Sequence, residues 1–212
     1  MKIVVVDYGM GNLFSVRRAL EVAGGSGIEF SADPAALVGA DRVVLPGVGA
    51  FADGMAGLSR AGFVQALQEF TATGRPVLGI CLGMQMLMQE SREFGTTAGL
   101  GLIPGKVVAI ERARDDGTRR KLPSIGWAPL VPGPEGWQGS ALEETPVGAA
   151  VYFLHSFHAQ VMHTGHMLAS YDYEGMPVTA AVRRDNVTGM QFHPEKSGPV
   201  GLGILRRFVQ RG

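Results

Sequence analysis

The sequence predicts an α/β protein with a mostly parallel central sheet flanked by helices and a smaller mixed or antiparallel sheet in its second half. Short apolar strands alternate with helical segments through the first half, which is typical of a parallel sheet covered on both faces. Strand-like segments separated by turns follow one another in the second half. The chain has 212 residues, enough for one sizeable core, so we expect a single domain over residues 1–212.

The elements of the first half follow from apolar runs and from capping residues. Asn12 is a suitable N-cap and Gly24 a suitable stop for the first helix. Asp33 caps a short helix that has Pro34 at its first position. In chain order we predict a strand at 2–6, a helix at 13–22, a strand at 28–30, a short helix from 34, a strand at 42–45, a helix at 62–71, a strand at 76–80 and a helix at 82–90.

The second half is predicted to be antiparallel or mixed, because turn sequences such as Glu174-Gly175 and Asp185-Asn186 separate its strand-like runs. Residues 129–149 are rich in Pro, Gly and Glu and are predicted to form a surface loop. The predicted strands are 106–112, 151–155, 166–173, 178–183 and 187–192, and a closing helix is predicted at 199–210.

The composition excludes several functional classes. Nineteen basic and nineteen acidic side chains cancel, which gives no electrostatic reason to expect nucleic acid or a membrane surface as a partner. A single cysteine excludes an internal disulfide framework and a multi-cysteine zinc site. No apolar run reaches membrane-spanning length. We therefore expect a cytoplasmic protein without a cofactor.

The only cysteine, Cys81, stands between the predicted strand at 76–80 and the predicted helix at 82–90. The turn Gly79-Ile80-Cys81-Leu82-Gly83 has the spacing of a nucleophile elbow, with sulfur in place of a hydroxyl. The start of a helix favours the thiolate form. On this turn alone, a buried structural cysteine is an equally good interpretation.

A second motif, His193-Pro194-Glu195, follows the predicted strand 187–192. A thiol nucleophile needs a base, and histidine is the usual one. The histidine in turn needs a group that fixes its orientation, and the spacing allows Glu195 to do so. Alone, such a short motif is most often an incidental loop. Together with the elbow, it predicts a catalytic triad of Cys81, His193 and Glu195.

The segments around these residues resemble the two signatures of class I glutamine amidotransferases. They are Gly79-Ile80-Cys81-Leu82-Gly83-Met84-Gln85 and Gln191-Phe192-His193-Pro194-Glu195-Lys196-Ser197. Three further segments resemble, more narrowly, the glutaminase subunits of imidazole glycerol phosphate synthases. They are residues 7–13 (DYGMGNL), 45–51 (LPGVGAF) and 152–156 (YFLHS). The resemblance covers essentially the whole chain.

The resemblance implies that Cys81 attacks the side-chain amide of glutamine and that a glutamyl thioester is hydrolysed to glutamate. The oxyanion formed on the way needs two donors. The resemblance assigns one to the backbone N–H of Leu82 and the other to the backbone N–H of Val48 or Gly49, in the segment Pro46-Gly47-Val48-Gly49 that ends the predicted strand 42–45. Glycine-flanked peptides rotate easily, so this segment is a candidate switch that closes when a partner binds.

The resemblance also implies a substrate site and a partner. Gln85 and Glu93 are expected near the α-amino group of glutamine, and Ser156 and Phe157 near its carboxylate. Ammonia is expected to pass to a (β/α)8-barrel cyclase subunit, which makes imidazole glycerol phosphate in histidine biosynthesis. The implied docking residues are Tyr8, Met10, Asn12, Trp127, Tyr152 and Lys196.

Two positions depart from the family pattern. Ala128 stands where asparagine is usual, and Phe157 where tyrosine is common. These departures leave open a paralogue that supplies ammonia to another synthase, for example in cell-surface sugar amidation. A non-catalytic interaction subunit of the same fold is a third hypothesis.

A metal site is a further alternative, because His155-x-x-His158 and His163-x-x-His166 repeat one spacing. On a strand, residues three apart point to opposite faces, and no cysteine lies nearby. We therefore expect no metal.

Overall fold

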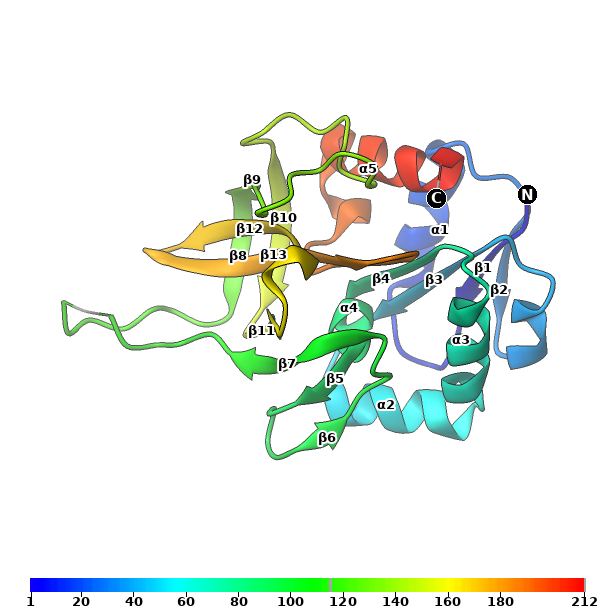
Figure 1. Ribbon diagram of the computed structural model, residues 1–212, viewed down its shortest axis with the longest axis horizontal. Coiled ribbons are helices and arrows are strands. Elements are labelled where there is room, and N and C mark those ends of the chain that lie inside the picture. Colours follow the sequence, from blue (N-terminus) through cyan, green and yellow to red (C-terminus); the bar gives the residue numbers. More distant parts are fainter. Residues whose placement is uncertain (115, 212) are drawn as a thin grey trace.

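The computed structural model describes residues 1–114 and 116–211, and it has the predicted α/β architecture (Figure 1). Within these residues the largest sheet has the strand order β2-β1-β3-β4-β14-β13-β12-β9. Its first five strands run parallel, and β13, β12 and β9 continue it in antiparallel fashion. The strands are β1 (Ile3–Val6), β2 (Ile28–Ser31), β3 (Arg42–Gly47), β4 (Val77–Cys81), β9 (Val131–Pro132), β12 (Met167–Tyr173), β13 (Met176–Arg184) and β14 (Val187–Met190).

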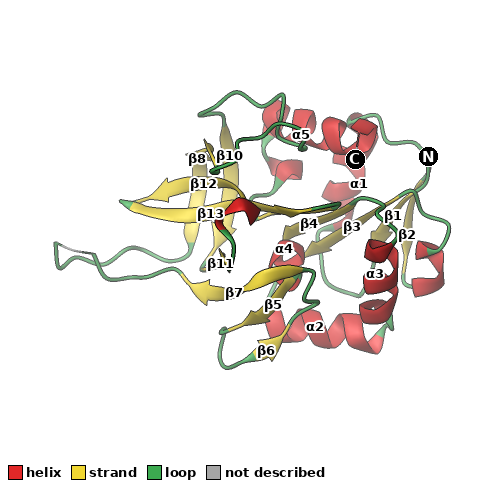
Figure 2. Cartoon of the chain, viewed as in Figure 1, coloured by secondary structure: helices red, strands yellow, loops and turns green. Residues whose placement is uncertain are grey.

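Helices cover both faces of this sheet (Figure 2). They are α1 (Leu13–Val22), α2 (Phe51–Arg60), α3 (Phe63–Ala72), α4 (Leu82–Met86) and α5 (Gly198–Arg211). Alternate residues of β1 enter different cores, as expected for a strand buried on both sides. Ile3 and Val5 pack with residues of α1 and α5, whereas Val4 and Val6 pack with α2 and α3.

Two smaller sheets lie beside the central one. A mixed sheet has the order β11-β7-β5-β6, and β10 pairs with β8 in an antiparallel ribbon. Their strands are β5 (Met88–Ser91), β6 (Thr97–Ala98), β7 (Ile103–Ala109), β8 (Ser124–Pro129), β10 (Ala150–His155) and β11 (Phe157–Val161). The second-half strands β12, β13 and β14 thus extend the main sheet, and the separate sheets form beside it.

The capping predictions at the first two helices are confirmed. The Asn12 side chain accepts a hydrogen bond from the backbone of Ser15, 3.3 Å away, at the start of α1. The Asp33 carboxylate accepts one from Ala35 at 2.9 Å, where a short 3-10 helix begins at Pro34. Local side chains therefore set these two helix starts.

Three local predictions are wrong. The helix expected at 82–90 ends at Met86, because residues 88–91 leave it to pair with β6 and β7. The helix α2 was not expected, and glycines at 54 and 57 hide it in the sequence. The segment 129–149 is more than a surface loop, since Trp137 and Leu142 are buried in the core and it contains β9.

No helix within residues 1–114 and 116–211 is long and apolar enough to cross a membrane.

Candidate active site

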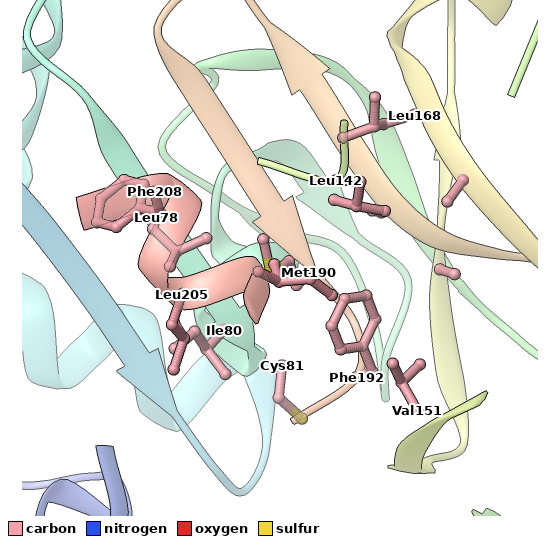
Figure 3. Packing of buried hydrophobic residues seen from close by; sticks show 14 of the residues in the cluster. Leu78, Ile80, Cys81, Leu142, Val151, Leu168, Met190, Phe192, Leu205 and Phe208 are labelled. Atoms are coloured by element: carbon pink, nitrogen blue, oxygen red, sulfur yellow. The ribbon is translucent and has the colours of Figure 1, made fainter. Parts of the chain in front are cut away.

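Cys81 lies at the junction of β4 and α4 in a backbone conformation that non-glycine residues rarely adopt, with φ 55° and ψ −110°. Such strain clusters at functional sites. The elbow is tight: a Cβ on Gly79 would lie 2.8 Å from the Gly83 carbonyl carbon. Figure 3 shows Cys81 beyond Ile80 at the end of its strand, on the side of Phe192. The backbone of Cys81 is thus fixed at the carboxyl-terminal end of the central strand β4.

His193 and Glu195 follow β14, the strand beside β4. The His193 Nδ1 lies 2.9 Å from the Glu195 Oε1, and both side chains are almost completely buried. This contact leaves Nε2 for the sulfur. Burial alone lowers the pKa of His193, but hydrogen bonds to Cys81 and Glu195 and the charges of both outweigh it and raise the pKa to about 10. The imidazole therefore holds a proton firmly beside the sulfur.

The segment 46–49, made of the end of β3 and the two residues after it, lies beside the elbow, because Gly47 stands opposite Cys81 in the register of β3 and β4. A Cβ on Gly47 would lie 2.6 Å from the Tyr8 hydroxyl and 3.0 Å from the Gly83 nitrogen. Beyond it, Val48 is 42% exposed and Gly49 has φ 100°. There is thus no room for a side chain at Gly47, and the residue after it is exposed to solvent.

Tyr8, expected at a partner interface, is buried instead and donates a hydrogen bond to the Pro46 carbonyl at 3.0 Å. Burial, and secondly the charge of nearby Cys81, raise the pKa of Tyr8, so the hydroxyl stays a donor. Met10, from the same loop, lies 2.9 Å from the position of a Cβ on Gly49. The loop after β1 therefore contacts the segment 46–49 at both ends.

The residues expected to bind glutamine come from three segments, namely α4 with Gln85, the loop after β5 with Glu93, and the start of β11 with Ser156 and Phe157. The Gln85 Nε2 donates to the Phe157 carbonyl and to the Gln191 Oε1, at 3.0 Å each. The Glu93 carboxylate accepts from the backbone of Phe51 at 2.7 Å and so caps α2, which lacks a cap from its own Ala50. Ser156 lies between β10 and β11. Helix α4 is therefore bonded to β11 and to Gln191, whereas the loop after β5 is bonded to the start of α2.

Gln191 was not predicted to have a role, although its Nε2 lies 3.8 Å from the Cys81 sulfur. The sequence contained one signal for it. Residues two apart on an extended chain face the same side, and Gln191 precedes His193 by two.

Comparison with known proteins agrees with this geometry. The family model described as "Glutamine amidotransferase class-I" matches residues 4–211. The chain belongs to the class I glutamine amidotransferase family. It is 46% identical over 208 residues to "Imidazole glycerol phosphate synthase subunit HisH 1" of Legionella pneumophila (strain Lens), covering 97% of each chain. It is 47% identical over 214 residues to "Imidazole glycerol phosphate synthase subunit HisH" of Lacticaseibacillus casei, covering 98% of this chain and 95% of the relative.

Solved structures share the fold at lower identity. The structure of PurLQS from Thermotoga maritima has a TM-score of 0.70 at 20% identity and covers 99% of this chain and 96% of its own. A structure described as a glutamine amidotransferase has the same TM-score at 18% identity, with 97% of this chain and 96% of the other covered. These likenesses confirm the predicted fold class.

Behind the active site of this amidotransferase, a buried polar chain has fixed donor directions. The Phe157 carbonyl only accepts, so the His155 Nδ1, 2.8 Å away, carries a proton. Burial lowers the pKa of His155 to about 3, which keeps the ring neutral. The His155 Nε2 therefore accepts from the Tyr171 hydroxyl at 2.9 Å, and the Tyr171 oxygen accepts from Ser124 at 2.9 Å. This histidine is engaged in the protein's own hydrogen bonds.

The other histidine pair shows no metal-binding geometry either. The rings of His163 and His166 meet edge to face at 5.3 Å between centroids. Within the described part of the chain, no group of three or more His, Cys, Asp or Glu side chains is placed to hold a metal ion.

We expect Tyr171→Phe to lower the free energy of unfolding by about 1–3 kcal/mol, because the buried His155 Nε2 then loses its donor and Ser124 its acceptor. Urea unfolding followed by circular dichroism measures this. The control is Tyr152→Phe, where the ring is half-buried and the change should stay within about 0.5 kcal/mol. Equal effects in the two variants would contradict the network.

The ribbon of β8 and β10 has an apolar outer face. Three cross-strand pairs form it, namely Trp127 with Tyr152, Ile125 with Leu154, and Pro129 with Ala150. Trp127 is 58% exposed, and its ring lies edge to face with that of Tyr152 at 6.1 Å. The face adjoins the triad, because the His193 amide donates to the Tyr152 carbonyl at 2.9 Å. Two of the six expected docking residues thus lie on one apolar surface.

Three other expected docking residues lie near that surface or in the loop and helix start after β1. Lys196 is exposed, and its ammonium lies 5.9 Å from the centre of the Tyr152 ring. Met10 is half-buried against Gly49, and Asn12 is exposed but is used to cap α1.

Proposed function

We propose that this chain, as one glutamine amidotransferase domain in the cytoplasm, is the glutaminase subunit of an imidazole glycerol phosphate synthase in histidine biosynthesis. Its reaction converts glutamine and water into glutamate and ammonia. The observation that carries the proposal is the convergence of Cys81, on its strained elbow, with the buried pair of His193 and Glu195. The identity of nearly half with proteins named HisH supports the choice of synthase.

In the proposed mechanism the Cys81 sulfur attacks the side-chain amide carbon of glutamine. His193 already holds a proton on Nε2 beside the sulfur, and it gives this proton to the departing ammonia, which leaves a glutamyl thioester. Water then attacks the thioester while His193 removes its proton, and glutamate leaves as the thiolate and the protonated imidazole are restored. Glu195 holds the ring through the 2.9 Å contact to Nδ1 throughout.

We assign the oxyanion site to the Leu82 amide at the start of α4 and to the Val48 or Gly49 amide of the segment 46–49. The tightly packed Gly47 and the left-handed Gly49 support a segment that is fixed at one end and rotates at the other. The loop that carries Tyr8 and Met10 contacts this segment, so a partner that docks on the loop has a direct route to it.

We assign glutamine binding to Gln85, Glu93, Ser156 and Phe157. The Gln85 Nε2 is occupied by Phe157 and Gln191, so its Oε1 is the atom that faces a substrate ammonium. Glu93 uses one carboxylate oxygen to cap α2. The second oxygen is the one we assign to the substrate. We assign the backbone groups around Ser156 and Phe157 to the α-carboxylate of the glutamine substrate.

The partner of the proposed complex is the cyclase subunit, and we place its docking surface on the apolar face of β8 and β10. This face lies beside the triad and exposes Trp127, the kind of aromatic anchor found at interface centres. Ala128 lies on the opposite face of β8, where it pairs with Val151 and packs against the core, so this departure from the family pattern leaves the docking face unchanged. Lys196 lies beside the docking face, and Met10 contacts the segment 46–49. Ammonia released at Cys81 would then enter the cyclase without crossing bulk water.

The decisive experiment measures glutamate release by this chain alone and after addition of the cyclase subunit from the same organism. We expect the cyclase to stimulate glutamate release and the complex to form imidazole glycerol phosphate with glutamine as nitrogen donor. Glutamate release that responds only to a different synthase would contradict the histidine-pathway assignment. No release with any synthase would favour the non-catalytic subunit.

A further inference from the structure

We propose that Gln191 is a positioning residue that donates a side-chain N–H to the Cys81 sulfur and thereby stabilises it as a thiolate. The inference rests on the proposed function only in taking Cys81 as the nucleophile. The Gln191 Nε2 lies 3.8 Å from the sulfur, within reach of an N–H···S contact, and the side chain has no solvent exposure. Bonds from neutral donors to a charged acceptor are stronger than those to a neutral one.

The direction of this hydrogen bond follows from a chain of contacts that begins at a backbone carbonyl. The Phe157 oxygen accepts hydrogen bonds and never donates them, so the Gln85 atom 3.0 Å away is its NH₂ group. The same NH₂ group lies 3.0 Å from Gln191, and the Gln191 atom facing it is therefore the oxygen. The remaining Gln191 atom, which faces Cys81, is then the nitrogen.

The backbone holds Gln191 in place as well. The register of the parallel pair β4 and β14 sets Met190 opposite Ile80, so the next residues along, Gln191 and Cys81, are neighbours. The Gln191 amide donates to the Ala180 carbonyl at 2.8 Å. Gln191 therefore approaches the sulfur from a rigid sheet.

A buried amide is also costly for stability. Its polar atoms must leave water, and an apolar side chain of similar size serves a core as well or better. Between the buried Met190 and Phe192, an amide is explained by what it contacts. Those contacts are the nucleophile on one side and Gln85 on the other.

Two variants of Gln191 separate positioning from packing. Gln191→Met keeps the volume and removes the donor, while Gln85 keeps its bond to the Phe157 carbonyl. Gln191→Glu keeps both the size and an acceptor for Gln85, but places a carboxylate beside the sulfur. A packing role predicts that Glu, the closer isostere, disturbs the site least. The proposed role predicts that Glu disturbs it most, because like charges repel.

The readout is the pH dependence of Cys81 alkylation by iodoacetamide in the free chain, which requires neither glutamine nor a partner. We expect the profile to move to higher pH by about 1–2 units in Gln191→Met, the range for a hydrogen bond to a charged group. The move should be larger in Gln191→Glu. The value of kcat for glutamine hydrolysis should fall about tenfold or more while KM changes little.

Val182→Ala is the matched control, because it removes buried volume from β13 beside β14 without touching Cys81. It should lower stability and leave the alkylation profile unmoved. An unshifted profile in both Gln191 variants would overturn the inference, as would a smaller shift in Gln191→Glu than in Gln191→Met. Either result would leave the glutaminase proposal standing, since that proposal depends on glutamate release.

Discussion

Replacing Cys81 by alanine is expected to lower glutamine hydrolysis by at least about 10⁴-fold, because the covalent route through a thioester disappears with the sulfur. The fold should survive, since the thiol is a small part of a large apolar cluster. Glutamate release from the complex with the cyclase subunit measures the loss.

Added ammonia supplies the control for this variant. Ammonia replaces the product of Cys81, so the complex of Cys81→Ala should still make imidazole glycerol phosphate from ammonium salts at high pH. Retention of the ammonia reaction together with loss of the glutamine reaction separates a missing nucleophile from a misfolded subunit. Retained hydrolysis of glutamine would show that another group attacks the amide, and the triad assignment would fail.

The sequence was most informative where function or local capping dictates the residue. Cys81 and its two flanking glycines carry the elbow in five consecutive positions, and His193 and Glu195 are adjacent to one proline. Asn12 and Asp33 set helix starts through side chains two or three residues away. These features depend on short stretches of chain, so the residues alone reveal them.

The missed features depend on contacts between distant segments. Helix α2 contains Gly54 and Gly57, which weaken it locally but let Met86 and Tyr8 pack closely against it. Residues 88–91 include good helix formers yet pair with β7, because tertiary pairing outweighs weak propensity. The hydrogen bond from Phe51 to Glu93 spans 42 positions, and that from Ser124 to Tyr171 spans 47. No local pattern encodes these pairs.

The second large effect is expected at Gly83, where alanine should prevent the native packing of α4 against β3. A Cβ at this position would lie 1.8 Å from the Leu45 carbonyl oxygen and 2.8 Å from its carbon. Both are backbone atoms of a buried central strand, and no rotamer change relieves the overlap. We expect Gly83→Ala to lower the free energy of unfolding by more than about 4 kcal/mol, measured by urea unfolding.

Gly203→Ala is the matched control, because Gly203 is also helical and a Cβ there meets nothing within 4 Å. Alanine is the better helix former, so this variant should gain about 0.5–1 kcal/mol. The two changes in the free energy of unfolding have opposite signs only because of the space around each added Cβ, since both substitutions raise the local helix propensity. A Gly83→Ala protein within about 1 kcal/mol of the wild type would mean that the elbow is looser than its contacts indicate. Contact between α4 and β3 would then not be what holds Cys81 in its strained conformation.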